Sequence, residues 1–335
     1  MIFLIKKDLI MKMVTKSLFL SCLLSLGAIA QESSPTVEKS LTSTPQSQKS
    51  DIRLFRADNT QGTITPKSIE AAFEKAGFVI AANNDMNFPF KRDFKETSFD
   101  IYNLMVVFRK DTALALAERY PEIGLFTPMS LSIYTKKGEK SISVASLDVK
   151  SMAQMMHIPE DNPEMIALGE KIEEALHSAM PKGKFVPLPY TMQKPKQELI
   201  TRVTFTQKGD DWEEAKDDFE TAFEEQLAPN GFVMAGFTDL NYEFEEHDKE
   251  WYYFYDVYSI CKIAVIYEIA KHHPEAGALA PCSAYKYQKV GEKSIHMAFP
   301  NVYKWIASMD IKDKASIDVL LDAQKRFEDM LHKIQ

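Results

Sequence analysis

The octapeptide PEIGLFTP at residues 121–128 occurs a second time, as PEAGALAP, at residues 274–281. Both copies read P-E-x-G-x-x-x-P, and the second begins 153 residues after the first. At the same distance, the pentapeptide GEKSI of residues 138–142 returns unchanged at residues 291–295. Two motifs that repeat with one spacing indicate a duplicated unit, so we expect two tandem copies of one domain.

Each copy shows the same expected order of strands and helices. Thr65-Pro66 and Asp211 are typical helix starts, and strands are indicated by alternation of side chains. In the first copy we expect strands near 52–54 and at 78–81, 99–109, 129–135 and 141–147, and helices at 66–76, 111–120 and 165–179. The order β-α-β-β-α-β-β-α, with hairpin-linked strands, predicts an α+β fold whose antiparallel sheets have helices packed on one face.

The N-terminus has the features of a secretory signal peptide. Lys12 and Lys16 precede a mostly apolar stretch, and Ala28-Ile29-Ala30 is a typical cleavage site. The apolar stretch has about ten residues, whereas a membrane span needs about 20. We expect cleavage after Ala30, a periplasmic or secreted protein, and no stable membrane span after cleavage. A lipoprotein site at Cys22 is less favoured, because apolar residues continue past it.

These signals give the expected domain boundaries. They are a signal peptide at 1–30, a disordered linker at 31–50, a first repeat domain at 51–190, an interdomain linker at 191–200 and a second repeat domain at 201–335. The linker at 31–50 is rich in Ser, Thr, Gln, Pro and Lys and has no apolar period.

The charge and the missing motifs exclude several classes of function. The chain carries a formal net charge of −8, which becomes −11 without residues 1–30. Nucleic acid and anionic membranes require Lys and Arg to neutralise phosphate, so neither is an expected partner. The sequence contains no P-loop and no G-x-G-x-x-G, G-x-S-x-G, H-E-x-x-H or C-x-x-C motif. We therefore predict no cofactor and no metal site.

Three features shared by the copies resemble the domain-of-unknown-function 302 family. They are the strand G-F-V at 77–79 and 231–233, the strand D-[IV]-Y at 100–102 and 256–258, and the P-E-x-G-x-x-x-P turn. The resemblance spans about residues 53–180 and 201–333. It implies a fold similar to the TATA-box-binding-protein-like class, and it implies no agreed biochemical activity.

The family pattern further implies a cysteine late in the third strand and another directly after the turn. The second copy has both, as Cys261 and Cys282, whereas the first copy has Met105 and Met129 at the positions we align with them. If these cysteines do chemistry in the family, the second copy alone retains it.

Three roles for Cys261 and Cys282 remain open from the sequence. They can be buried thiols that behave as small apolar side chains. They can form a disulfide, since an exported chain meets an oxidising compartment and closing a loop of about 20 residues stabilises by roughly 3 kcal/mol. They can also serve redox, sulfur or soft-metal chemistry, which requires a lowered thiol pKa. Lys262 is adjacent, but neighbouring strand residues point to opposite faces.

Other unusual features have ordinary interpretations. His272 and His273 are unsuited to coordinating one metal ion together, because adjacent residues of a helix lie about 100° apart around its axis. The second copy has a net charge of −10 over residues 201–335, which suits a solvated helix face, a cation site or a basic partner. The aromatic run at 251–255 fits plain strand propensity or a protein interface.

The sequence therefore predicts an exported protein that is more a binding or protein-interaction module than an enzyme. Its expected partner is a periplasmic protein or a small molecule of unknown identity. The alternative is a thiol-dependent redox or sulfur-handling protein that uses Cys261 and Cys282.

Overall fold

A duplicated order of strands and helices is the main feature of the computed structural model, which describes residues 50–195 and 197–334. The expected signal peptide at 1–30, its cleavage site and all of the expected linker except residue 50 lie outside the described residues. The described parts of both repeats belong to one compact unit. Among the described residues, none of the helices is both long and apolar enough to cross a membrane.

The elements of the two repeats correspond one to one, except for two elements named below. In the first repeat they are β1 (Ile52–Asp58), α1 (Pro66–Lys75), β2 (Val79–Asp85), α2 (Asn87–Phe94), β3 (Phe99–Phe108), α3 (Lys110–Leu116), η1 (Pro121–Leu125), β4 (Met129–Lys136), β5 (Ser141–Leu147), α4 (Val149–Met155), α5 (Pro163–Ala179) and β6 (Lys184–Val186). In the second they are β7 (Ile200–Thr206), α6 (Trp212–Leu227), η2 (Ala228–Asn230), β8 (Val233–Asp239), α7 (Leu240–Glu245), β9 (Tyr252–Cys261), α8 (Ile263–Ala270), η3 (Pro274–Ala278), β10 (Cys282–Lys289), β11 (Ser294–Pro300), α9 (Val302–Ser308) and α10 (Lys314–Ile334).

The predicted α+β fold is confirmed, with additional short helices. Each repeat contains the expected order of strands and helices and adds one helix after its second strand and one after its hairpin, namely α2 and α4, or α7 and α9. Helices α1 and α6 begin at the expected caps. Thr65 Oγ1 accepts from the Ser68 amide, and the Asp211 carboxylate accepts from the Glu213 and Glu214 amides. The exceptions to the correspondence are β6, which belongs to the first repeat, and η2, which belongs to the second.

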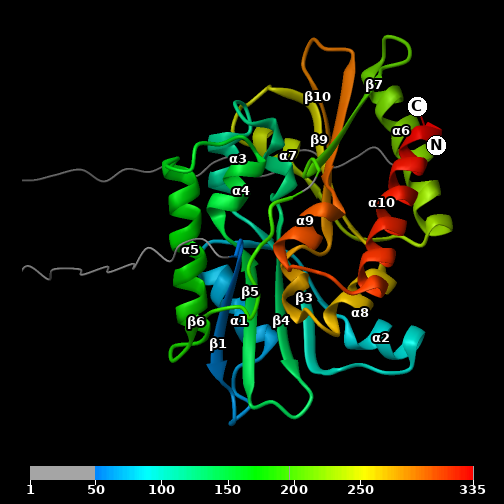
Figure 1. The fold of residues 1–335 in the computed structure, drawn as a ribbon. Helices are drawn as coiled ribbons and strands as arrows, with labels where there is room; N and C mark the ends of the chain where they lie inside the picture. Colours follow the sequence, from blue (N-terminus) through cyan, green and yellow to red (C-terminus); the bar gives the residue numbers. More distant parts are fainter. Residues whose placement is uncertain (1–49, 196, 335) are drawn as a thin grey trace, which may run out of the picture. The chain divides into compact units, whose positions relative to one another are not determined.

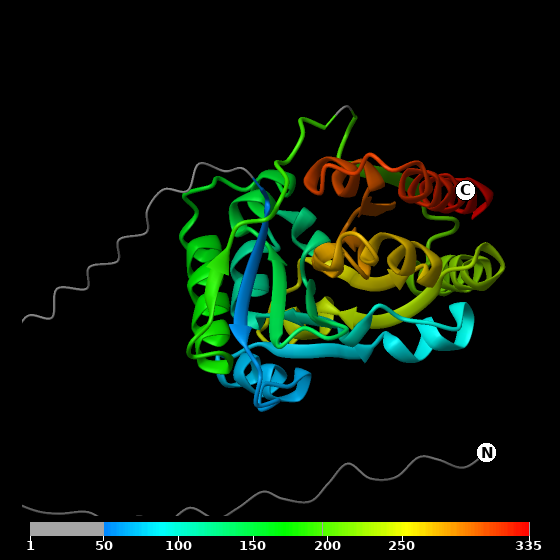
Figure 2. The same cartoon turned by 60° about the horizontal axis from the view of Figure 1, so that its bottom comes forward.

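Each repeat builds one antiparallel sheet. The strand order is β2-β3-β4-β5-β1-β6 in the first sheet and β7-β11-β10-β9-β8 in the second. Helices cover one face of each sheet: Phe55 of β1 packs edge-on against His177 of α5, and Phe205 of β7 packs against Phe219 of α6. Figures 1 and 2 show α5 and α10 on opposite outer sides, with the sheets between them.

The strand register corrects one alignment between the repeats. We aligned Asp256 with Asp100, and therefore Cys261 with Met105. The structure pairs Asp239 with Asp256 at the place where Asp85 pairs with Asn103, so the true offset in this strand is 153 residues. Cys261 therefore corresponds to Phe108, and each ends its strand with one residue between it and the following helix.

The repeated octapeptide turns join the two repeats to each other. The Tyr255 hydroxyl of β9 accepts a hydrogen bond from the Gly124 amide of η1 at 2.9 Å, and the Ser132 hydroxyl of β4 donates to the Pro274 carbonyl of η3 at 2.7 Å. Each turn thus packs on the inner face of the other repeat's sheet. The prolines that end the turns, Pro128 and Pro281, both follow cis peptide bonds.

A reciprocal pair of hydrogen bonds continues this interface. Ser130 of the first repeat donates to the Pro281 carbonyl at 2.9 Å, and Ser283 of the second donates to the Pro128 carbonyl at the same distance. All four groups occupy equivalent positions, so the repeats meet with approximate two-fold symmetry. The octapeptide motif therefore serves the contact between the two copies.

Candidate functional site

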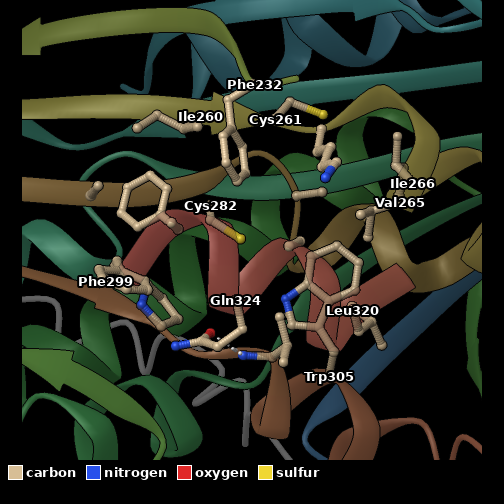
Figure 3. Close-up of a pocket in the computed structure, with 17 residues that line it drawn as sticks. Phe232, Ile260, Cys261, Val265, Ile266, Cys282, Phe299, Trp305, Leu320 and Gln324 are labelled. Atoms are coloured by element: carbon tan, nitrogen blue, oxygen red, sulfur yellow. Dashed lines mark hydrogen bonds between the residues drawn. The ribbon is translucent and has the colours of Figure 1, made fainter. Parts of the chain in front are cut away.

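A cavity of about 80 Å³ lies in the second repeat, between the sheet and the helices α8, α9 and α10. Both cysteines of the described residues, Cys261 and Cys282, line it, and Figure 3 shows their sulfur atoms at the cavity. The remaining lining residues are mainly apolar and include Phe232, Val265, Phe299, Trp305, Leu320 and Phe327. The cavity is large enough for a few water molecules or for one small apolar molecule.

The sequence difference between the repeats explains why the second one contains this space. Cys282 and Ala284 on β10 pair with Ile260 and Tyr258, as Met129 and Leu131 on β4 pair with Val107 and Met105. The second repeat thus has Cys261, Cys282 and Ala284 where the first has Phe108, Met129 and Leu131. All three replacements remove side-chain volume at neighbouring positions, and the surrounding backbone is too well packed to collapse fully into the space.

The two cysteines lie on neighbouring strands, as the turn and hairpin pattern predicts. Cys261 is the last residue of β9, Cys282 is the first residue of β10, and Cys282 lies opposite Ile260 in the ladder. Both are free thiols, Cys261 buried and Cys282 partly exposed. The Cys282 thiol donates to the Leu279 carbonyl at 3.4 Å. The disulfide proposed from the sequence remains a prediction.

Burial shifts both thiols toward the protonated form. It raises the pKa of Cys261 to about 12, with a smaller contribution from the charge of Cys282. It also raises the pKa of Cys282 to about 12, against a smaller lowering effect of a hydrogen bond with Trp305. The nucleophilic and metal-binding form of cysteine is the thiolate, so near neutral pH this site presents two weakly reactive thiols.

Besides the two thiols and the Trp305 indole, the polar side chains at the cavity are those of Lys262 and Gln324. We expected Lys262 to point away from Cys261, and this is wrong because β9 ends at Cys261 and strand alternation stops there. The Lys262 ammonium lies 2.8 Å from an Asp322 carboxylate oxygen and 5.5 Å from the ring centre of Phe232. Its charge is thus already paired, which leaves the cavity without a free cation among its lining residues.

Gln324 has its hydrogen bonds made within the protein. Its carbonyl oxygen accepts from the Val302 amide at 3.1 Å, and its amide nitrogen donates to Thr201 and Glu328 at 3.0 and 2.6 Å. With the polar groups satisfied and the thiols protonated, the lining favours an uncharged occupant. This arrangement suits binding more than acid–base or nucleophilic chemistry.

The other candidate residues have structural roles. His273 lies 3.3 Å from Glu275, outside the cavity. Of the aromatic run, Tyr252 and Tyr255 reach into the first repeat: Tyr252 donates to the Ala117 carbonyl at 2.6 Å, and Tyr255 donates to the Pro121 carbonyl. The other rings of the run pack within the second repeat, where Tyr253 and Phe254 stack on Trp212 of α6. The run thus serves both ordinary strand packing and the interface between the two copies, which the alternation of side chains alone did not show.

Part of the acidic excess of the second repeat pairs with lysines under α6. The buried Lys286 ammonium lies 2.9 Å from Asp256 and 2.7 Å from Glu220, and Lys216 lies 3.2 Å from Asp256. These contacts form an internal ion-pair network on the helix-covered face of the sheet. Within residues 50–195 and 197–334, no group of three or more His, Cys, Asp or Glu side chains is placed to hold a metal ion.

Comparison with known proteins gives a family and no activity. The family model described as "Domain of unknown function DUF302" matches residues 62–180 and 211–334, one match in each repeat. A search of curated proteins finds no match. A crystal structure described as an uncharacterized conserved protein DUF302 from Bacillus stearothermophilus is similar at 16% sequence identity and a TM-score of 0.35. That match covers 42% of this chain and 100% of the other.

Proposed function

We propose a function from the cavity alone, because the chain belongs to the family of the Domain of unknown function DUF302 and this description names no activity. Each repeat contains one copy of the domain. We propose a non-catalytic binding protein whose second repeat holds a small, uncharged and mostly apolar molecule. The first repeat then acts as the scaffold on which the binding repeat is docked.

The observation that carries this proposal is the loss of side-chain volume at three neighbouring positions. A cavity lined by Phe232, Phe299 and Trp305 offers a ligand apolar contacts that the protein leaves unused. Ligand sites are commonly concave and largely apolar, with a few polar groups that orient the ligand. The raised thiol pKa values oppose a catalytic role, because they keep the potential nucleophiles protonated.

Filling the cavity tests the proposal. Ala284→Leu copies Leu131 of the first repeat and should abolish binding while preserving the fold. Benzene is the probe, since small apolar cavities accept it. A ligand that binds the folded protein raises its melting temperature by an amount that grows with the logarithm of one plus the ratio of ligand concentration to Kd. We expect benzene to raise the melting temperature of the natural chain and of Leu131→Met, and to leave that of Ala284→Leu unchanged. An equal response of all three proteins would contradict the proposal.

We also propose that the protein works outside the cytoplasm, on the basis of the signal-like residues 1–30. The mature chain should begin at Gln31. N-terminal sequencing of the protein isolated from its native cells tests this, and a retained N-terminal segment in the membrane fraction would refute it.

The second candidate function is thiol chemistry, favoured by the placement of Cys261 and Cys282 on adjoining strands around one cavity. It requires thiols that react while the protein is folded. The binding proposal instead expects alkylation by iodoacetamide at pH 8 to be at least about 100-fold slower in the folded than in the unfolded chain, since burial suppresses the thiolate. Rapid labelling of the folded protein would favour the thiol function.

A further inference from the structure

The two sheets differ at one edge. In the first sheet, β6 pairs with β1 and forms the outer edge, as Figure 1 shows. In the second sheet, β7 is the equivalent of β1, because each pairs with the second strand of its repeat's hairpin. Within the described part of the chain, no strand pairs with the outer edge of β7. An edge strand with free backbone groups is a template for adding another strand.

The segment after β6 also covers Glu275, the glutamate of the second repeat's octapeptide turn. The Tyr190 hydroxyl donates to Glu275 at 2.5 Å, and Glu275 is 4% exposed. Burial, and then the charge of Glu275, raise the pKa of Tyr190 far above its ordinary value, which keeps this hydroxyl a donor. The chain from Lys184 to Tyr190 therefore both extends the first sheet and closes over the turn.

Glu122, the equivalent glutamate of the first repeat's turn, is not covered by such a segment in the described part of the chain. Its side chain keeps 24% of its exposure, against 6% for Glu275. Arg202 on β7 lies 3.7 Å from Glu122 and is itself 43% exposed. The uncovered Glu122 carboxylate and the free edge of β7 are therefore side by side at the second sheet, as the covered Glu275 and the paired edge of β1 are at the first sheet.

We propose that β7 and Glu122 form a docking site for an extended segment of another protein. The segment adds a strand along β7 and places a tyrosine hydroxyl on Glu122, four residues beyond the paired strand, as Tyr190 follows Val186. Strand addition of this kind takes its affinity from backbone hydrogen bonds and its specificity from side-chain sites. The second repeat has a net charge of −10, whereas the covering segment begins with Lys184 and is preceded by Lys182. Charge complementarity thus favours a basic segment.

The chain supplies its own probe. A fluorescein-labelled peptide of residues 181–190, PKGKFVPLPY, should bind the full-length mature chain at one site, measured by fluorescence anisotropy. Glu122→Gln, and separately replacement of the peptide's tyrosine by phenylalanine, should each weaken binding about tenfold or more, because each removes a hydrogen bond to a charged group. The two changes together should weaken it no further, since they remove the same bond.

Two further measurements separate the contribution of the β7 strand edge to peptide binding from that of the Glu122 carboxylate. N-methylation of the peptide at the residues equivalent to Phe185 and Val186 removes strand donors and should abolish binding. Glu275→Gln is the matched control; it should lower the melting temperature and leave peptide affinity unchanged. The proposal is overturned by absence of saturable binding up to 1 mM, on the order of the weakest specific affinities, or by equal affinity of Glu122→Gln. It is also overturned if sedimentation shows that the chain is a dimer and that the peptide dissociates this dimer.

Discussion

Single residue differences between the repeats create the candidate site. The sequence identifies Cys261 and Cys282 as unusual, and the turn and hairpin pattern correctly predicts that they lie on neighbouring strands. It did not reveal the cavity, because our alignment of Cys261 with Met105 concealed that a phenylalanine, Phe108, is the residue replaced. The triplet D-V-Y at 256–258 resembles D-I-Y at 100–102 more than N-L-M at 103–105, its true counterpart, so residue similarity alone gives the wrong strand register.

The buried thiols should make the protein less stable at alkaline pH. The native pKa of each thiol, about 12, exceeds its value in the unfolded chain. Above about pH 8.5 the unfolded chain loses thiol protons that the native protein keeps, so the free energy of unfolding falls as pH rises. We expect a loss of about 1–2 kcal/mol per thiol at pH 10. Urea unfolding at pH 7 and 10 measures it. Cys261→Ala should reduce this pH dependence by the share of one thiol, whereas the share of the buried tyrosines, whose pKa values burial also raises, should stay the same in both proteins.

At the scale of elements, the sequence predicts the hairpins closely and their contacts poorly. The strands expected at 129–135 and 141–147 are β4 and β5 to within one residue. The octapeptide is as easy to recognise in the sequence as the hairpins, but the reason for its glycine lies in the other repeat. A Cβ on Gly277 would lie 2.5 Å from Leu104 and 2.7 Å from Ser132 of the first repeat. Such a contact joins residues more than 140 positions apart, and local patterns carry no information about it.

The turn glycines should therefore be intolerant of even a methyl group. Gly277→Ala would force the turn away from the first sheet and should lower the free energy of unfolding by about 1–3 kcal/mol, the usual cost of overpacking. Gly236→Ala in β8 is the matched control, because its Cβ would meet Ser259 at an ordinary 3.6 Å. Chemical denaturation of both variants measures the difference. Equal stabilities would show that the turn can shift without cost.

At the scale of the molecule, the duplication was predictable and the docking of the copies was not. Two motifs at one offset are sufficient to infer two repeats, whereas the reciprocal bonds of Ser130 and Ser283 involve residues with no distinctive sequence signal. The interface also contains the buried ion pair of Asp51 with Lys304, which have no charged counterparts at equivalent positions. The covering segment of the first repeat and the cavity of the second repeat are therefore differences between two copies that otherwise meet with approximate two-fold symmetry.

This interface should make the two repeats unfold together. All three tryptophans, Trp212, Trp251 and Trp305, belong to the second repeat, so their fluorescence reports on that repeat alone, while circular dichroism reports on both. If each turn supports the other repeat's sheet, the two signals should give one coincident denaturant transition, which is the test of two-state behaviour. Gly124→Ala, a change in the first repeat whose Cβ would lie 2.6 Å from the Tyr285 Cβ, should shift the tryptophan transition to lower denaturant. Two separate transitions, or a tryptophan transition that Gly124→Ala leaves unchanged, would mean that the repeats are independent domains and that their reciprocal contacts contribute little to stability.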